Sequence, residues 1–194
     1  TLSPSSAASD VYKRQEHPVT EMVTGLDLID CMLKVAADEP LDWPAMEKAP
    51  QGASMEVRIY AEDPLKNFQP SPGVLTEVFF PEDVRVDGWV STGSDVSAFY
   101  DPMIAKLIVH GTDRQDALAK MSAALAATRL HGIATNIDYL RQVVATPVFR
   151  DGDMWTRMLD SFAYAPNAIE VIAPGTYSSV QDLSLIHISA PTRH

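Results

Sequence analysis

The chain has 194 residues, and 46% of them are hydrophobic, which is enough for one mid-sized domain with a core and pieces of its neighbours. Fifteen Lys and Arg against 26 Asp and Glu give a formal net charge of −11, which repels phosphate backbones and excludes the nucleic-acid-binding classes. The sequence has no run of about 18 apolar residues and no charged segment followed by an apolar one near its start. It therefore predicts neither a membrane span nor a signal peptide.

The two ends differ from the middle of the chain. Residues 1–15 are rich in Ser and Ala and lack any helical or strand periodicity, and residues 183–194 break the pattern just as abruptly. Both segments resemble translated sequencing-adapter read-through, and natural disordered tails are the alternative. Under either interpretation we expect no site residue within them.

The first patterned segment predicts a helix. Thr24 and Asp27 have the spacing of a capping box, and apolar residues then recur at helical intervals until Glu39 and Pro40, a span of about a dozen residues. The single cysteine, Cys31, lies within this pattern and cannot form an internal disulfide. We expect it to be a buried structural thiol in a reducing, cytoplasmic compartment.

A small antiparallel sheet or barrel is predicted next, after a proline-rich loop at 41–52. Residues 55–61 alternate, with Val57 and Ile59 on one side and Arg58 on the other, as in a half-buried strand. Further apolar runs separated by turn residues predict the other strands, at 74–80, 84–90 and 103–109.

Helices complete an α+β pattern. Thr112 begins a second capping box, with Gln115, and an amphipathic helix is predicted from there to about Arg129. Another helix is expected after Asn136, ending before Pro147. A last short helical turn is expected around 155–159, and a strand with a Pro-Gly turn from 169.

Few residues are candidates for chemistry. The five histidines show no i, i+4 pairing and have no cysteine partners, so the sequence gives little support for a zinc site. Arg58 stands mid-strand, where it could aim donors into a cleft or form a cross-strand ion pair, and the pattern alone favours the ion pair. Glu16 and Glu21 flank His17-Pro18, and either could be a helix cap or a general base, with the cap favoured.

Five segments together resemble the biotin carboxylase family in one colinear series that covers about residues 16–160. They are EHPVTEMVTGLDL at 16–28, EVRIYAEDP at 56–64, FQPSPG at 68–73, YDPMIAKLIVHG at 100–111 and GIATNIDYL at 132–140. The resemblance implies the α+β fold of the biotin carboxylase C-terminal domain, a small antiparallel sheet or barrel with packed helices. The last helix of an ATP-grasp domain would precede it.

The resemblance also implies a division of the chain into domains. We expect a non-native or disordered tail at 1–15, the end of the ATP-grasp domain at 16–50, and the biotin carboxylase C-terminal domain at 51–163. A linker and the start of a carboxyltransferase domain would follow at 164–182, and a second tail at 183–194.

In this family ATP activates bicarbonate as carboxyphosphate, and biotin on a carrier domain takes up the carbon dioxide. The resemblance implies that Glu16 deprotonates bicarbonate and that Arg58 binds biotin and stabilises its developing negative charge. The cofactors would be biotin, ATP and magnesium, with most nucleotide and metal ligands outside this chain. Tyr12, Arg14 and Gln15 depart from the motif before Glu16, so we expect the 194-residue chain alone to be inactive.

The segment at 161–182 resembles the junction of urea carboxylases and of fused urea amidolyases, where GTYSSVQD opens a carboxyltransferase domain. The implied activity is that of a ligase that uses ATP, bicarbonate and urea to give allophanate. A biotin carrier domain and a carboxyltransferase domain would be its partners, and a homodimer is a further option. The alternatives are the biotin carboxylase subunit of an acyl-CoA carboxylase, and a non-catalytic packing or dimerisation fragment.

Overall fold

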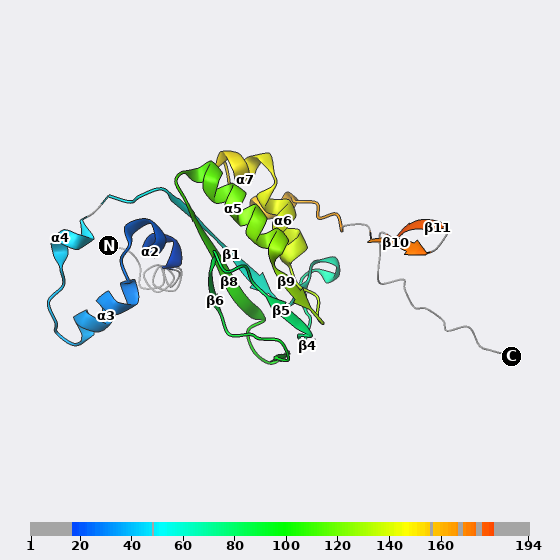
Figure 1. The fold of residues 1–194 in the computed structure, drawn as a ribbon, viewed down its shortest axis with the longest axis horizontal. Helices are drawn as coiled ribbons and strands as arrows, with labels where there is room; N and C mark the ends of the chain where they lie inside the picture. The colour runs from blue at the N-terminus through cyan, green and yellow to red at the C-terminus, as the bar shows by residue number, and fades with distance from the viewer. Residues whose placement is uncertain (1–16, 48, 156, 167–168, 174–175, 181–194) are drawn as a thin grey trace.

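A three-stranded antiparallel sheet lies at the centre of the computed structural model, which describes residues 17–47, 49–155, 157–166, 169–173 and 176–180. The strand order is β1-β8-β6. The bounds are Ala53–Tyr60 for β1, Met103–Gly111 for β8 and Arg85–Gly88 for β6. Figure 1 shows helix α5, Arg114–Ala127, lying along one face of this sheet.

The predicted alternation in β1 is confirmed, because Met55, Val57 and Ile59 are at most 7% exposed. The central strand β8 is buried over most of its length, as expected for a strand with neighbours on both edges. From α5, the predicted residues Leu118, Met121 and Leu125 pack into the same core. The core therefore lies between α5 and one face of the sheet.

The start of α5 differs by one residue from the predicted capping box. Asp113, not Thr112, is the N-cap, and its carboxylate accepts a hydrogen bond from the Asp116 N–H at 2.9 Å. The Asp116 carboxylate in turn accepts from the Thr112 N–H at 2.9 Å. Aspartate caps a helix at least as well as threonine, so the acidic pair takes over the reciprocal bonds that Thr112 and Gln115 were expected to make.

Three short helical elements follow, namely α6, Ile137–Val144, α7, Pro147–Asp151, and the 3₁₀ turn Met158–Ser161. As predicted, α6 ends before Pro147 and a helical turn forms near Met158. Helix α7 was not predicted. Proline fits the first turn of a helix, and the Thr146 hydroxyl accepts from the Phe149 N–H at 3.2 Å.

Short two-stranded ladders surround the central sheet, and the described strands form no closed barrel. The pairs are β2, Glu62–Asp63, with β3, Gln69–Pro70; β4, Gly73–Val74, with β7, Asp95–Val96; and β5, Glu77–Phe79, with β9, Arg129–His131. A second 3₁₀ turn spans Pro64–Lys66. Of the two predicted architectures, the small antiparallel sheet is therefore the correct one.

Before β1 the chain forms α2, Pro18–Thr24, α3, Leu28–Ala36, and the short α4, Trp43–Met46. The predicted cap at Thr24 is wrong. Its hydroxyl donates to the Thr20 carbonyl inside α2, whereas Asp27 caps α3 by accepting from the Asp30 N–H. The predicted helix is therefore α3, which begins after Asp27, whereas α2, which Gly25 ends in the left-handed conformation (φ 71°), was not predicted.

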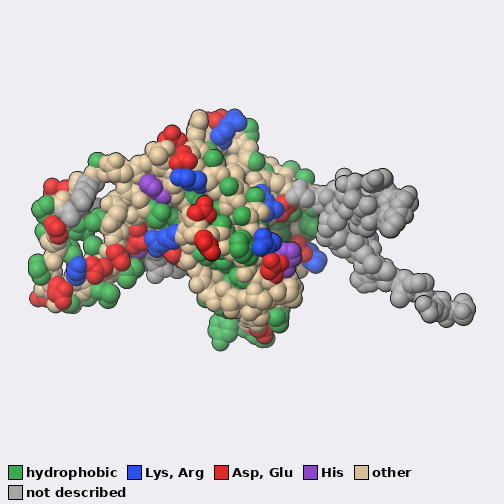
Figure 2. Space-filling model, viewed as in Figure 1, with side chains coloured by type: hydrophobic (Ala, Val, Ile, Leu, Met, Phe, Trp, Pro, Cys, Tyr) green, Lys and Arg blue, Asp and Glu red, His purple; other side chains and the backbone are tan. Residues whose placement is uncertain are grey.

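Helix α3 buries none of its residues in the described structure. Its apolar side chains Ile29, Met32, Leu33 and Val35 are 54–64% exposed. The expectation that Cys31 is buried is wrong, because its side chain is only partly covered. Figure 2 shows hydrophobic and acidic side chains side by side at this end of the molecule.

At the other end, β10, Ile169–Ala173, pairs with β11, Thr176–Val180, in an antiparallel hairpin. The strand predicted from 169 is thus confirmed, while the Pro-Gly turn at 174–175 lies outside the described residues. None of the helices in the described ranges is long and apolar enough to cross a membrane.

Candidate functional site

Charged side chains gather on the face of the sheet opposite α5. The register places Arg58 beside Lys106 of β8, and Lys106 beside Asp87 of β6. In the next row toward α2, Glu56 and Arg85 flank Ile108. Because side chains alternate across a strand, these charges share one face while their neighbours in sequence enter the core.

Arg58 lies on this face with its side chain 41% exposed. Its Nε atom is 3.7 Å from Oε1 of Glu56, two residues earlier on the same strand, and Glu56 is 11% exposed. The residue directly across the ladder is Lys106, a like charge, so that position cannot supply the ion pair that the sequence pattern favoured. A long, half-exposed ion pair of this kind stabilises the fold little.

A groove of about 560 Å³ follows the edge of β1 next to Arg58. Glu56, Arg58, Tyr60 and Glu62 contribute from the strand side, and Tyr139 is one of the apolar residues of the opposite wall. Burial raises the pKa of Glu62, and the nearby negative charge of Asp101 raises it further. The wall around Tyr139 is mostly apolar, with Asn136 and Asp160 as its polar members. A groove with a mostly apolar wall and a cationic donor suits a small ring that carries a polar atom.

Glu21 is an anchor in the described structure. Its Oε1 atom accepts from the Leu28 N–H at the start of α3 (3.1 Å), and its Oε2 atom accepts from Arg85 Nη1 (2.7 Å). Arg85 also donates from Nε and Nη2 to both carboxylate oxygens of Asp87, at 2.9 and 3.0 Å. Glu21 therefore joins two helices to the sheet, a role that the sequence did not reveal because its partner is 64 residues away.

Glu16 lies outside the described residues. Helix α2 begins two positions later, and its first residue, Pro18, is buried. The Glu21–Arg85 contact holds α2 against the charged face of the sheet. The structure thus describes Arg58 and its surroundings, and the assignment of Glu16 stays a prediction.

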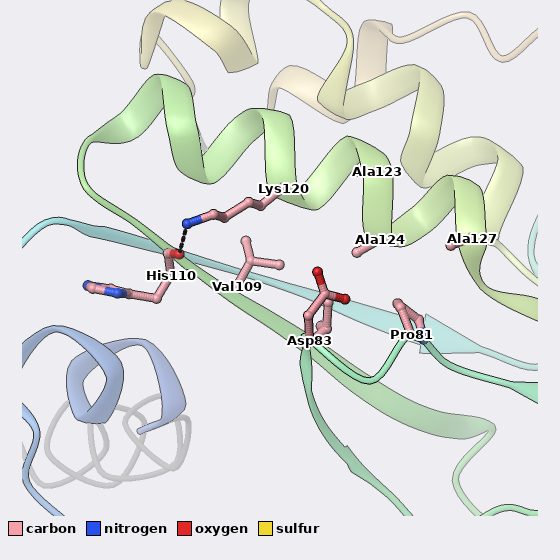
Figure 3. A pocket seen from close by; sticks show the side chains of 9 residues that line it. Pro81, Asp83, Val109, His110, Lys120, Ala123, Ala124 and Ala127 are labelled. Atoms are coloured by element: carbon pink, nitrogen blue, oxygen red, sulfur yellow. Dashed lines mark hydrogen bonds between the residues drawn. The ribbon is translucent and has the colours of Figure 1, made fainter.

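A second groove, of about 490 Å³, lies between α5 and the sheet (Figure 3). Lys120, a lysine that lines this groove, already donates hydrogen bonds from Nζ to the His110 carbonyl at 3.0 Å and to Asp116 at 2.9 Å. His110 Nε2 lies 2.8 Å from the Gln51 carbonyl oxygen. Alanines of α5 form much of the remaining wall, and neither predicted site residue lines it, so this groove is the weaker candidate.

Comparison with known proteins agrees with this architecture. The family model of the biotin carboxylase C-terminal domain matches residues 56–161. The chain belongs to this family. Near the N-terminus, residues 13–43 match the family model of the ATP binding domain of the carbamoyl-phosphate synthase L chain. The predicted α+β biotin carboxylase fold is confirmed, whereas the exact domain boundaries stay predictions.

Two urea amidolyases are among the relatives. Those of Lachancea kluyveri and Saccharomyces cerevisiae are 54% and 49% identical over 167 residues, covering 86% of this chain and 9% of each relative. Biotin carboxylase 2 of Bacillus subtilis is 47% identical over 146 residues, covering 74% of this chain and 33% of the relative. The chain thus spans about a tenth of the length of the urea amidolyases that it matches.

Solved structures give the same picture. The Kluyveromyces lactis urea carboxylase superposes with a TM-score of 0.77 at 52% identity, covering 84% of this chain and 14% of that one. The biotin carboxylase domain of a thermophilic 2-oxoglutarate carboxylase gives 0.72 at 38% identity, covering 76% and 34%.

Proposed function

We propose that the whole protein is a biotin-dependent urea carboxylase, a ligase that consumes ATP and bicarbonate and carboxylates urea to allophanate. The length of the matches carries this proposal. The two urea amidolyases align over 167 residues, whereas the bacterial biotin carboxylase aligns over 146. The longer match supports the interpretation of residues 161–182 as the junction to a carboxyltransferase domain.

In this proposal Arg58 acts on biotin at the groove beside β1. Biotin, when bound, supplies the ureido nitrogen that accepts the carboxyl group. Arg58 offers fixed guanidinium donors where negative charge develops on the ligand's oxygen, and a donor held on a rigid strand needs little reorganisation. Its planar fork also explains why lysine would substitute poorly.

The other cofactors would bind outside the described residues for the most part. In the described part of the chain, no three His, Cys, Asp or Glu side chains gather as a metal site would require. ATP and magnesium would therefore rely on the ATP-binding domain, of which residues 13–43 are one part. Glu16 would deprotonate bicarbonate, and a biotin carrier domain would deliver biotin. A homodimer and a cytoplasmic location belong to the same proposal.

The first prediction concerns Arg58→Ala in the whole protein. Loss of a donor to developing negative charge should lower kcat for biotin carboxylation by about 100-fold or more, with the melting temperature nearly unchanged. Arg150→Ala is the matched control, because this α7 arginine pairs with its neighbour Asp151 away from the groove. Wild-type turnover in Arg58→Ala would remove Arg58 from the mechanism.

The acceptor is tested in the same assay. ATP consumption that depends on urea supports a urea carboxylase. Stimulation by acetyl-CoA or propionyl-CoA, with no effect of urea, would instead support the acyl-CoA carboxylase alternative. If the whole protein consumes no ATP with urea, acetyl-CoA or propionyl-CoA present, the non-catalytic interpretation of this segment is favoured.

A further inference from the structure

The strand that carries Arg58 has an edge that another strand does not cover. β1 is the first strand in the order β1-β8-β6, so within the described sheet it pairs with β8 alone. Its register also shifts between Ile59 and Tyr60, one residue after Arg58. An irregular edge strand is the part of a sheet where pairing is least fixed.

The side chain of Asn136 covers this edge. Its Nδ2 atom donates to the Arg58 carbonyl at 3.1 Å, and its Oδ1 atom accepts from the Tyr60 N–H at 2.9 Å. The Asn136 backbone N–H also donates to the Tyr60 carbonyl at 3.2 Å. One buried residue, 6% exposed, thus satisfies three consecutive outward-facing backbone groups of β1.

Because its side chain bonds to β1, Asn136 does not cap its own helix, α6. It occupies the N-cap position of α6, where asparagine commonly accepts from a backbone N–H of the first turn, and here the side chain makes no such bond. The amide of Asn136 is directed at the strand instead.

The segment before Asn136 is itself held in place. The Ala134 N–H donates to the Ser71 hydroxyl at 3.0 Å, and the Thr76 N–H donates to the His131 carbonyl at 2.8 Å. At Gly132 (φ 107°) an added Cβ would lie 2.2 Å from the Val74 carbonyl oxygen, so only glycine fits this turn. Asn136 therefore reaches β1 from a fixed support.

From these contacts we infer that Asn136 is a positioning residue for Arg58, an inference that rests on the proposed function of Arg58. In a strand, a shift of register by one residue turns each side chain to the opposite face. Such a shift would move Arg58 toward the core face that Val57 and Ile59 occupy. By clamping the backbone on both sides of the register shift, Asn136 keeps the guanidinium on the ligand side.

The second prediction is tested with Asn136→Asp in the whole protein. The isosteric aspartate keeps an acceptor for the Tyr60 N–H and loses the donor to the Arg58 carbonyl. Misplacing a group by a fraction of an ångström is costly, so we expect kcat for biotin carboxylation to fall about tenfold. The KM for ATP should stay within about twofold of wild type, because Asn136 lies outside residues 13–43, the part of the chain that matches an ATP binding domain.

Gln142→Ala is the matched control. Gln142 lies near the other end of α6, and its amide likewise makes two hydrogen bonds to backbone. It accepts from the Ala165 N–H and donates to the Ala165 carbonyl. We expect this variant to retain wild-type kcat. If it loses as much activity as Asn136→Asp, the effect is a general loss of stability and the inference is wrong.

A double variant separates positioning from a structural role. If Asn136 acts through Arg58, then adding Asn136→Asp to Arg58→Ala should cause no further loss of kcat. Full additivity, or wild-type kcat in Asn136→Asp, would overturn the inference while the proposed function stands. Wild-type kcat in Arg58→Ala would remove Arg58 from the mechanism, and with it the role that this inference gives to Asn136. If Asn136→Asp folds poorly, Asn136→Thr is tested in its place, because threonine can cap α6.

Discussion

Arg85 shows how single residues shape this molecule. Its guanidinium pairs with Asp87 on its own strand and with Glu21 on α2, and the two hydrogen-bonded carboxylates raise its pKa above the ordinary arginine value. Glu21 is only 11% exposed, so its charge needs this partner. The carboxylate that could have been a general base is therefore committed to holding helices against the sheet.

Tyr164 fastens the segment after the last 3₁₀ turn to α6. Its hydroxyl donates to Asp138 Oδ2 at 3.0 Å, and its ring packs edge-on against Tyr139. Burial, first, and then the hydrogen bond and charge of Asp138 raise the pKa of Tyr164 to about 12. The folded protein thus holds this proton more tightly than the unfolded chain does.

The third prediction follows from that shift. The stabilisation from Tyr164 is complete below pH 10, the ordinary tyrosine value, and is lost as the pH rises toward 12. Between pH 10 and 12, the free energy of unfolding in urea should therefore decrease less with rising pH in Tyr164→Phe than in wild type. The tyrosinate absorbance of wild type minus that of the variant should titrate near 12. A difference titrating near 10 would mean that Tyr164 is neither buried nor bonded to Asp138 in the folded protein.

Among the elements, α3 and α5 show that regularly spaced apolar residues can have different environments. Both contain regularly spaced apolar residues. In the described structure, α5 packs on the sheet with Leu125 fully buried, while Leu33 of α3 is 64% exposed. A helical pattern predicts an apolar face but not whether another element of the same chain covers it.

The fourth prediction compares these two leucines by chemical denaturation of the 194-residue chain. Leu125→Ala should lower the free energy of unfolding by about 2–5 kcal/mol, because it leaves a cavity in the core. Leu33→Ala should change it by no more than about 0.5 kcal/mol, since it removes little buried surface. A loss at Leu33 comparable to that at Leu125 would show that α3 is covered in solution.

For the whole molecule, chemistry depends on more than the described sheet. The match to the ATP-binding domain covers residues 13–43, and the chain spans about a tenth of the urea amidolyases that it resembles. In the proposed function, Arg58 and its groove supply one wall of a biotin carboxylase site.

The fifth prediction is that the purified 194-residue chain shows no bicarbonate-dependent ATP hydrolysis. Phosphate release should stay at the level of a buffer blank with biotin and Mg²⁺ present, while the whole protein turns over ATP in the same assay. Circular dichroism of the chain confirms that an inactive sample is folded. Bicarbonate-dependent phosphate release from this chain would contradict the prediction.

The sequence by itself determined the elements whose signals are local. Alternation around Val57 and Ile59 predicted β1, helical spacing around Met121 predicted α5, and colinear motifs predicted the biotin carboxylase fold. The first two signals lie within the element that they predict, and the third comes from the order of short local motifs along the chain. The caps at Thr24 and Thr112 were wrong because a nearby aspartate took each role, a competition that spacing alone does not decide.

Only the tertiary structure decided which side chains meet. It paired Glu21 with Arg85 and placed Lys106 rather than an acid across from Arg58. Within the described residues it also buried no side chain of α3. It also brought Asn136 to the backbone at Arg58 and Tyr60 from 76–78 positions along the chain. Such contacts depend on strand register and on the path of the intervening loops, and the local pattern of residues predicts neither of these.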